Sequence, residues 1–151
     1  CTVQIWEMSD YISHENKNCG KGVYINDLAW APVNEYDYFS YWSDFSTVCP
    51  SGWRLPTGGG SGEFMSLTNA VGGKNNMEKN NNLLAFPNNF IYSGDYNYDK
   101  SGGRGTYGRY WSATPNGVAK AFRLGVASSN WVTPDGSWNK WDAFAVRCIA
   151  K

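Results

Sequence analysis

Residues 49–57 read Cys49-Pro-Ser-Gly-Trp-Arg-Leu-Pro-Thr57, a short apolar run enclosed by turn-forming residues. Gly52 and Pro56 bracket the run, and the two-residue period of an extended chain would place Trp53 and Leu55 on the same side. Proline cannot continue a strand inside a sheet, and Thr57 is a favoured residue at the start of a helix. The stretch therefore predicts a short strand that stops directly before a helix.

A helix is predicted to follow Thr57 and to end at Gly72-Gly73. Phe64, Leu67 and Val71 are spaced three and four residues apart, which puts them on one helical face. Upstream, the aromatic run at residues 34–45 fits a short helix or a loop, and a helix is preferred. Residues 72–89 are rich in Asn and Gly and predict a long loop.

From residue 90 onward the pattern changes to short β-branched or aromatic runs separated by Gly, Asn, Asp and Pro. The runs are residues 90–92, 107–113, 119–126, 131–133 and 143–149, and they predict a small antiparallel sheet. Alternation within the third run would place Phe122, Leu124 and Val126 on its core face. The last run would likewise place Phe144, Val146 and Cys148 on one face.

The chain is predicted to form one α+β domain over residues 1–151. Residues 1–35 would be an N-terminal hairpin or extension, and residues 41–149 the main body. Trp53, Phe64, Trp111, Phe122 and Phe144 are the aromatic residues predicted for the core. A composition of 42% hydrophobic residues with eight Trp excludes a disordered chain.

The formal net charge is zero, with 13 basic and 13 acidic residues, and the basic residues do not cluster. This argues against nucleic-acid binding, which relies on basic patches. No run approaches the about 18 apolar residues of a membrane-spanning helix, so membrane insertion is not expected. Because the sequence begins at Cys1 without Met, we expect a processed or truncated chain, from which an export signal or anchor would have been lost.

The four cysteines are Cys1, Cys19, Cys49 and Cys148. Irregular spacing and a single His disfavour a zinc site. Two disulfides fit better, and the economical pairing is Cys1–Cys19 with Cys49–Cys148, although four cysteines allow other connectivities and buried thiols are the alternative. Disulfides would imply an oxidising compartment.

Three segments, in this order, carry a resemblance to a known family. They are residues 49–57 followed by Glu63-Phe64, then Gly108-Arg-Tyr-Trp-Ser-Ala-Thr114, and finally Trp141-Asp-Ala-Phe-Ala-Val-Arg-Cys-Ile149. The chain from Tyr41 to Ile149 resembles the Fibrobacter succinogenes major paralogous domain, a bacterial branch of the C-type-lectin-like fold. Similar patterns occur in variable proteins of diversity-generating retroelements and in relatives of the formylglycine-generating enzyme.

The resemblance implies a C-type-lectin-like fold, with one or two helices packed on small antiparallel sheets and long irregular loops. In that fold a long-range disulfide joins the places that Cys49 and Cys148 occupy here. In the retroelement proteins the last part of the domain carries the variable residues on one face.

Catalysis is not predicted for this chain. The sole His14 lies in a polar segment, and the Gly-x-Ser-x-Gly motif of a nucleophile elbow does not occur. The formylglycine-generating relatives use a pair of cysteines, whereas Cys49 and Cys148 are better explained as one structural disulfide. An enzyme of that type remains the alternative.

The sequence predicts no cofactor, with a calcium ion as the one candidate. Asp95, Asn97 and Asp99 place oxygen ligands at alternate positions, as at the start of a calcium loop. The sixth position is Lys100 rather than Gly, and the twelfth is Thr106 rather than Glu. An aromatic-rich turn with solvated carboxylates is therefore the competing interpretation. The motifs of calcium-dependent sugar binding are incomplete.

Residues 128–142 and the neighbouring loop at residues 95–107 are the predicted recognition surface. Trp side chains alternate there with Asn, Asp, Lys and Ser, a composition that binding loops favour because aromatic rings give contact area at low entropy cost. Packed loop anchors are the alternative. The predicted ligand-binding residues are Tyr96, Tyr98, Tyr107, Arg109, Asn116, Asn130, Trp131, Trp138, Asn139 and Lys140.

The sequence thus predicts a non-enzymatic ligand-recognition domain, secreted or displayed on a bacterial or phage surface. Its partner would be a protein or glycan on another cell or surface. A variable protein of a diversity-generating retroelement is the most specific version, and a pilus-associated or envelope adhesin is the close alternative. A structural envelope protein without a specific ligand is a third class.

Overall fold

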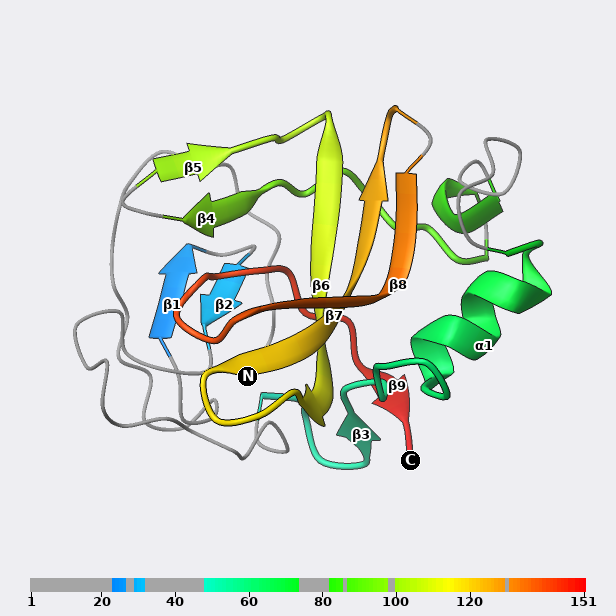
Figure 1. Cartoon of the computed structure of the whole chain (residues 1–151), viewed down its shortest axis with the longest axis horizontal. Coiled ribbons are helices and arrows are strands. Elements are labelled where there is room, and N and C mark those ends of the chain that lie inside the picture. Colours follow the sequence, from blue (N-terminus) through cyan, green and yellow to red (C-terminus); the bar gives the residue numbers. More distant parts are fainter. Residues whose placement is uncertain are drawn as a thin grey trace.

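The computed structural model describes residues 23–26, 29–31, 48–73, 82–85, 87–97, 100–129 and 131–151, the first two ranges as backbone only. The predicted helix at residues 34–45, His14 and the Cys1–Cys19 pair lie outside these residues. The described part is α+β, with helix α1 (Glu63–Ala70), a helical turn at residues 82–84 and four small antiparallel sheets (Figure 1). None of its helices is long and apolar enough to cross a membrane.

Three of the four sheets are two-stranded. β1 (Val23–Asn26) pairs with β2 (Ala29–Ala31), β3 (Trp53–Arg54) with β9 (Ile149–Ala150), and β4 (Asp95–Asn97) with β5 (Lys100–Gly102). Residues 143–149, predicted as one strand, make only isolated bridges before β9 begins, so that prediction was wrong in extent.

The central sheet has the order β6-β7-β8, formed by β6 (Tyr107–Pro115), β7 (Lys120–Ala127) and β8 (Trp131–Asn139). The runs at residues 107–113 and 119–126 are confirmed as strands. β8 continues to Asn139 through Pro134 and Gly136, although these residues predicted a loop. Because β8 lies at the sheet edge, Pro134 need not remove a bond of the ladder, and the register shift between Arg123 and Gly125 adjusts the pairing.

Helix α1 is fixed at its N-terminus by side chains. The hydroxyl of Thr57 accepts a hydrogen bond from the backbone N–H of Glu63 (3.0 Å), and the Glu63 carboxylate accepts one from the N–H of Thr57 (2.9 Å). Thr57 therefore caps the helix, as predicted. It does so from several residues upstream, because the N-cap position itself is occupied by Gly62. Two bonds of 2.6 Å join Arg54 to Glu63 and hold the pKa of Glu63 at about 2.

The core consists of two apolar clusters. The predicted helix face is confirmed, because Phe64 lies in the larger cluster with Leu67 and Val71 packed against it. The larger cluster comprises Phe64, Leu83, Phe90, Tyr110, Leu124, Val126, Val132 and Ala145. The smaller one comprises Val48, Leu55, Trp111, Ala121 and Phe144.

Two aromatic residues predicted for the core are elsewhere. Trp53 is 47% exposed, because β3 ends at Arg54 and the chain then turns Leu55 inward. Phe122 is only half-buried beside Gly58 and Gly59, and neighbouring Ala121 enters the core instead.

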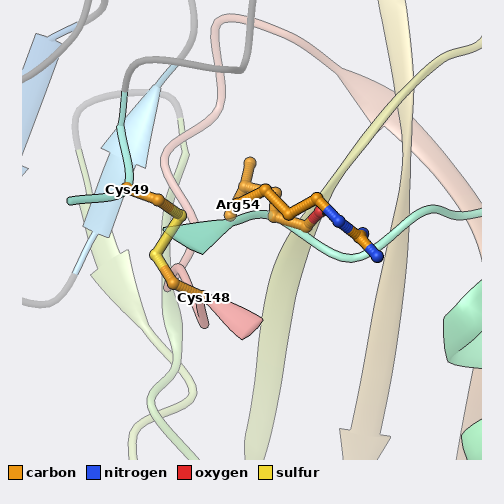
Figure 2. The surroundings of a disulfide bond; sticks show 4 residues. Cys49, Arg54 and Cys148 are labelled. Atoms are coloured by element: carbon orange, nitrogen blue, oxygen red, sulfur yellow. A yellow bond between two sulfur atoms is a disulfide. The ribbon is translucent and has the colours of Figure 1, made fainter. Parts of the chain in front are cut away.

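The Cys49–Cys148 disulfide is confirmed, with an S–S distance of 2.07 Å. It ties β3 to the segment that enters β9, next to the pairs of Trp53 with Ala150 and Arg54 with Ile149. In Figure 2 the side chain of Arg54 extends away from the disulfide toward α1, where Glu63 receives it. The first of the three motifs is thereby joined to the last.

Candidate ligand-binding face

One face of the central sheet gathers arginine and aromatic side chains from three strands. Arg109 on β6 lies opposite Gly125 on β7, which lies opposite Thr133 on β8. Two residues further along the strands, Ala127 on β7 pairs with Tyr107 on one side and with Trp131 on the other. Because directly opposed residues of an antiparallel sheet project from the same face, these side chains are neighbours.

Arg109 is held from several sides. Its guanidinium forms a salt bridge with Asp95 and lies 4.8 Å from the ring centre of Tyr107 and 4.5 Å from that of Trp138. The hydroxyl of Tyr107 donates to the other oxygen of Asp95 (2.8 Å). Burial, followed by the hydrogen bond to Asp95, raises the pKa of Tyr107.

These contacts bear on the predicted calcium site. Asp95 is 8% exposed, and its two carboxylate oxygens are engaged by Tyr107 and Arg109 rather than open to a calcium ion. The carboxylate is also not solvated, as the competing interpretation had it. Asn97 is half-buried, and Asp99 lies outside the described residues. In the described ranges no group of three or more His, Cys, Asp or Glu side chains could hold a metal ion.

Arg123 was not among the predicted site residues, yet it lies at the centre of this face. It is 3% exposed, and its guanidinium is 5.1 Å from the ring centre of Trp131 and 5.2 Å from that of Trp138. Burial, followed by repulsion from Arg109, lowers the pKa of Arg123 to about 10. Within the described part of the chain its Nε and Nη1 atoms are buried without a hydrogen-bond partner.

The sequence predicted Trp138 and Lys140 in an exposed loop, and this prediction was wrong. Trp138 belongs to β8, is half-buried and packs against the smaller apolar cluster. Lys140 is 2% exposed, and burial lowers its pKa. β8 bends along its length (Figure 1), and the exposure of these two residues near its end depends on tertiary packing rather than on local composition.

Asp142, close to Trp138, is 1% exposed, and neither carboxylate oxygen has a hydrogen-bond partner among the described residues. Burial, and then the charge of Asp95, raise the pKa of Asp142 to about 7, although Arg109 and the nearby indole N–H of Trp138 act in the opposite direction. The sequence signal for Asp142 was only its place beside Trp141, which does not distinguish a buried carboxyl from an exposed one.

The predicted binding residues that remain are spread over the two ends of the sheet. Asn116 donates to the Ser137 hydroxyl (2.9 Å), and Asn139 pairs with Lys120 at the same end. Tyr107 and Trp131 lie at the other end, about 25 Å away along the nine residues of β6. A small ligand therefore contacts one end or the other.

The Trp131 end has the more open surroundings. Trp131 is 36% exposed, and the adjoining turns at residues 104–106 and 128–129 are exposed and joined by a bond from the Ser128 N–H to the Thr106 carbonyl (2.8 Å). Tyr96 on β4 is half-buried and bridges to Ala143. Tyr98 and Asn130 lie outside the described residues. Aromatic faces, hydroxyls and backbone groups are thus available here for stacking and hydrogen bonding.

A scan against protein-family models, a search of curated proteins and a search of solved structures each found no match for this chain.

Proposed function

We propose that this protein is a non-enzymatic recognition domain that binds a protein or glycan at the Trp131 end of the central sheet. The observation that carries the proposal is the exposure of Trp131, at 36%, while its ring is held over the guanidinium of buried Arg123 at 5.1 Å. An exposed aromatic ring offers a large contact area through only two rotatable bonds, so little side-chain entropy is lost on binding.

The surrounding scaffold supports this role. Tyr107 is fixed by its hydrogen bond to Asp95, and the adjoining turns are tied together by Ser128 and Thr106. Binding residues on loops and strand ends that a rigid framework positions are a common arrangement in recognition domains. The Cys49–Cys148 disulfide, which closes the chain over a separation of 99 residues, contributes to that framework.

We further propose a C-type-lectin-like architecture and display outside the cell. The motif at residues 49–57 supplies β3 and the cap of α1, the motif at residues 108–114 supplies β6, and the last motif supplies Cys148. A disulfide is typical of an oxidising compartment. In the retroelement version Tyr107 and Trp131 would be variable positions; in an adhesin without diversification they would be fixed.

The test compares two exposed tryptophans. Trp131→Ala and its matched control Trp53→Ala are each applied to a printed glycan array and to an array of purified extracellular proteins. Trp53 is 47% exposed but lies in β3, away from the proposed face (Figure 1). We expect Trp131→Ala to abolish capture with a stability loss of about 1 kcal/mol, and Trp53→Ala to bind like the wild type. Equal capture by the two variants would refute the proposed face.

The retroelement version has its own test at the level of the gene. A near-identical copy of the segment that encodes the end of the domain, differing mainly at adenines, should lie beside the gene together with a reverse transcriptase. If both are missing from the neighbourhood, that version is wrong and the adhesin remains.

A further inference from the structure

Four buried polar atoms without hydrogen-bond partners converge around Gly125. They are Nε of Arg109, Nε and Nη1 of Arg123, and the hydroxyl oxygen of Thr133, all within the described residues. We refer to Arg109, Arg123 and Thr133, with Trp131 above them, as the Gly125 cluster. Buried polar groups normally have partners, so several such atoms in one place call for a physical reason.

The strand register brings these residues together. Gly125 pairs with Arg109 on one side and with Thr133 on the other, and opposed residues lie about 4.5–5.5 Å apart between Cα atoms. A Cβ on Gly125 would collide with Nη1 of Arg123 and would lie 2.6 Å from the Trp131 ring. The guanidinium of Arg123 and the indole of Trp131 therefore lie directly over the glycine.

The cluster has a surplus of donors and of positive charge. Arg109 is neutralised by Asp95, but no acidic side chain forms an ion pair with Arg123 in the described ranges. Asp142 does not fill this role, because the charges that act on its pKa are those of Asp95 and Arg109. The charge of Asp95 acts on Arg123 from a distance, but Asp95 is already paired with Arg109. An arginine that is 3% exposed, faces aromatic rings and has no carboxylate of its own is costly to bury, and an anion would offset that cost.

We infer that the Gly125 cluster binds the carboxylate of an acidic sugar, and this rests on the proposed recognition function. A carboxylate is planar and matches the two parallel N–H donors of a guanidinium, and the Thr133 hydroxyl is a third donor. The sugar ring would lie against the exposed face of Trp131. Rotation of this partly exposed side chain, which is fast, opens the way to Arg123 beneath it.

The experiment titrates the wild-type protein with D-glucuronate, with D-glucose as the neutral match and with glutamate and sulfate as acidic compounds that are not sugars. The readouts are the ¹⁵Nε–H signal of Arg123 and Trp fluorescence. We expect saturable shifts with glucuronate and weaker or no response to the other three.

Two variants locate the interaction. Arg123→Met keeps the length of the side chain without its charge and is expected to weaken glucuronate binding about 10- to 100-fold. Thr133→Val keeps the shape of the side chain and should weaken binding about 2- to 10-fold. If Arg123→Met fails to fold, the response of the wild-type Arg123 signal to glucuronate and the affinity of Thr133→Val still test the carboxylate site.

Each remaining outcome overturns the inference. Equal binding of glucose shows that the carboxylate is not recognised, and equal binding of glutamate points to an acidic peptide. Equal binding of sulfate indicates an inorganic anion site, and no response to any acid removes the anion site altogether. A ligand from either array that depends on Trp131 but competes with none of these compounds would retain the proposed function while refuting the acidic sugar.

Discussion

Asp142 makes the stability of this protein depend on pH in an unusual direction. Its carboxyl has a pKa of about 7 in the folded chain against an ordinary value of 3.8, because it is 1% exposed and because the negative charge of Asp95 acts on it. A group that holds its proton more tightly when folded stabilises the fold fully below its unfolded pKa. This stabilisation is lost as the pH rises through the folded pKa.

The magnitude follows from the difference of about 3 between the two pKa values. At 1.36 kcal/mol for each unit, the total is about 4 kcal/mol, of which about 3 kcal/mol falls between pH 5 and pH 8. For a chain of 151 residues this corresponds to a fall in Tm of about 6–12 °C over that range.

Asp142→Asn removes the titration while preserving the shape of the side chain. Unfolding of both proteins between pH 5 and pH 8 should show the wild type losing stability relative to the variant, the difference between them growing by about 3 kcal/mol over that range. Comparing the two proteins cancels the titration of the groups that they share. Parallel curves would refute the reasoning, because the Asp142 carboxyl would then find a partner when it ionises.

Three further predictions concern the framework. Replacing both Cys49 and Cys148 with Ala removes a closure of 99 residues and should lower the free energy of unfolding in urea by about 4.7 kcal/mol, whereas a loss below about 1 kcal/mol would show that the bridge does not constrain the chain. Glu63→Gln should cost about 1 kcal/mol or less at pH 7, because the carboxylate is 40% exposed. Since the pKa of Glu63 is about 2, the wild type should lose this stabilisation as the pH falls from 4.5 to 2, opposite in sign to the effect of Asp142. A wild type that loses no stability relative to the variant in this range would contradict the ion pair. Trp138→Ala should destabilise by about 3 kcal/mol because the ring packs against the core, while Trp53→Ala should change stability by less than about 1 kcal/mol; equal thermal shifts would contradict these placements.

Much of the local structure could be predicted from the sequence because it depends on neighbouring residues. The spacing of Phe64, Leu67 and Val71 defined the buried helix face, and alternation identified the strands around Leu124. The failures have a common cause. Alternation assumes an uninterrupted strand, and the early end of β3 at Arg54 left Trp53 outside the core.

The candidate site was predictable only in part. Trp131 and Tyr107 were identified from composition, since aromatic residues among Ser, Gly and Asn are typical of binding surfaces. Arg123 escaped notice because an arginine inside a strand is more often at the surface, and its burial here depends on the rings of Trp131 and Trp138.

By itself the sequence determined the mixed α+β class, the amphipathic helix, two strands of the central sheet and an economical partner for Cys148, because periodicity, capping residues and cysteine number act through short-range rules. Only the tertiary structure decided which aromatic rings reach the surface and which arginine is buried without an acid. Those outcomes depend on the register of β6, β7 and β8 around Gly125, and register arises from the packing of strands far apart in sequence, which no local pattern specifies.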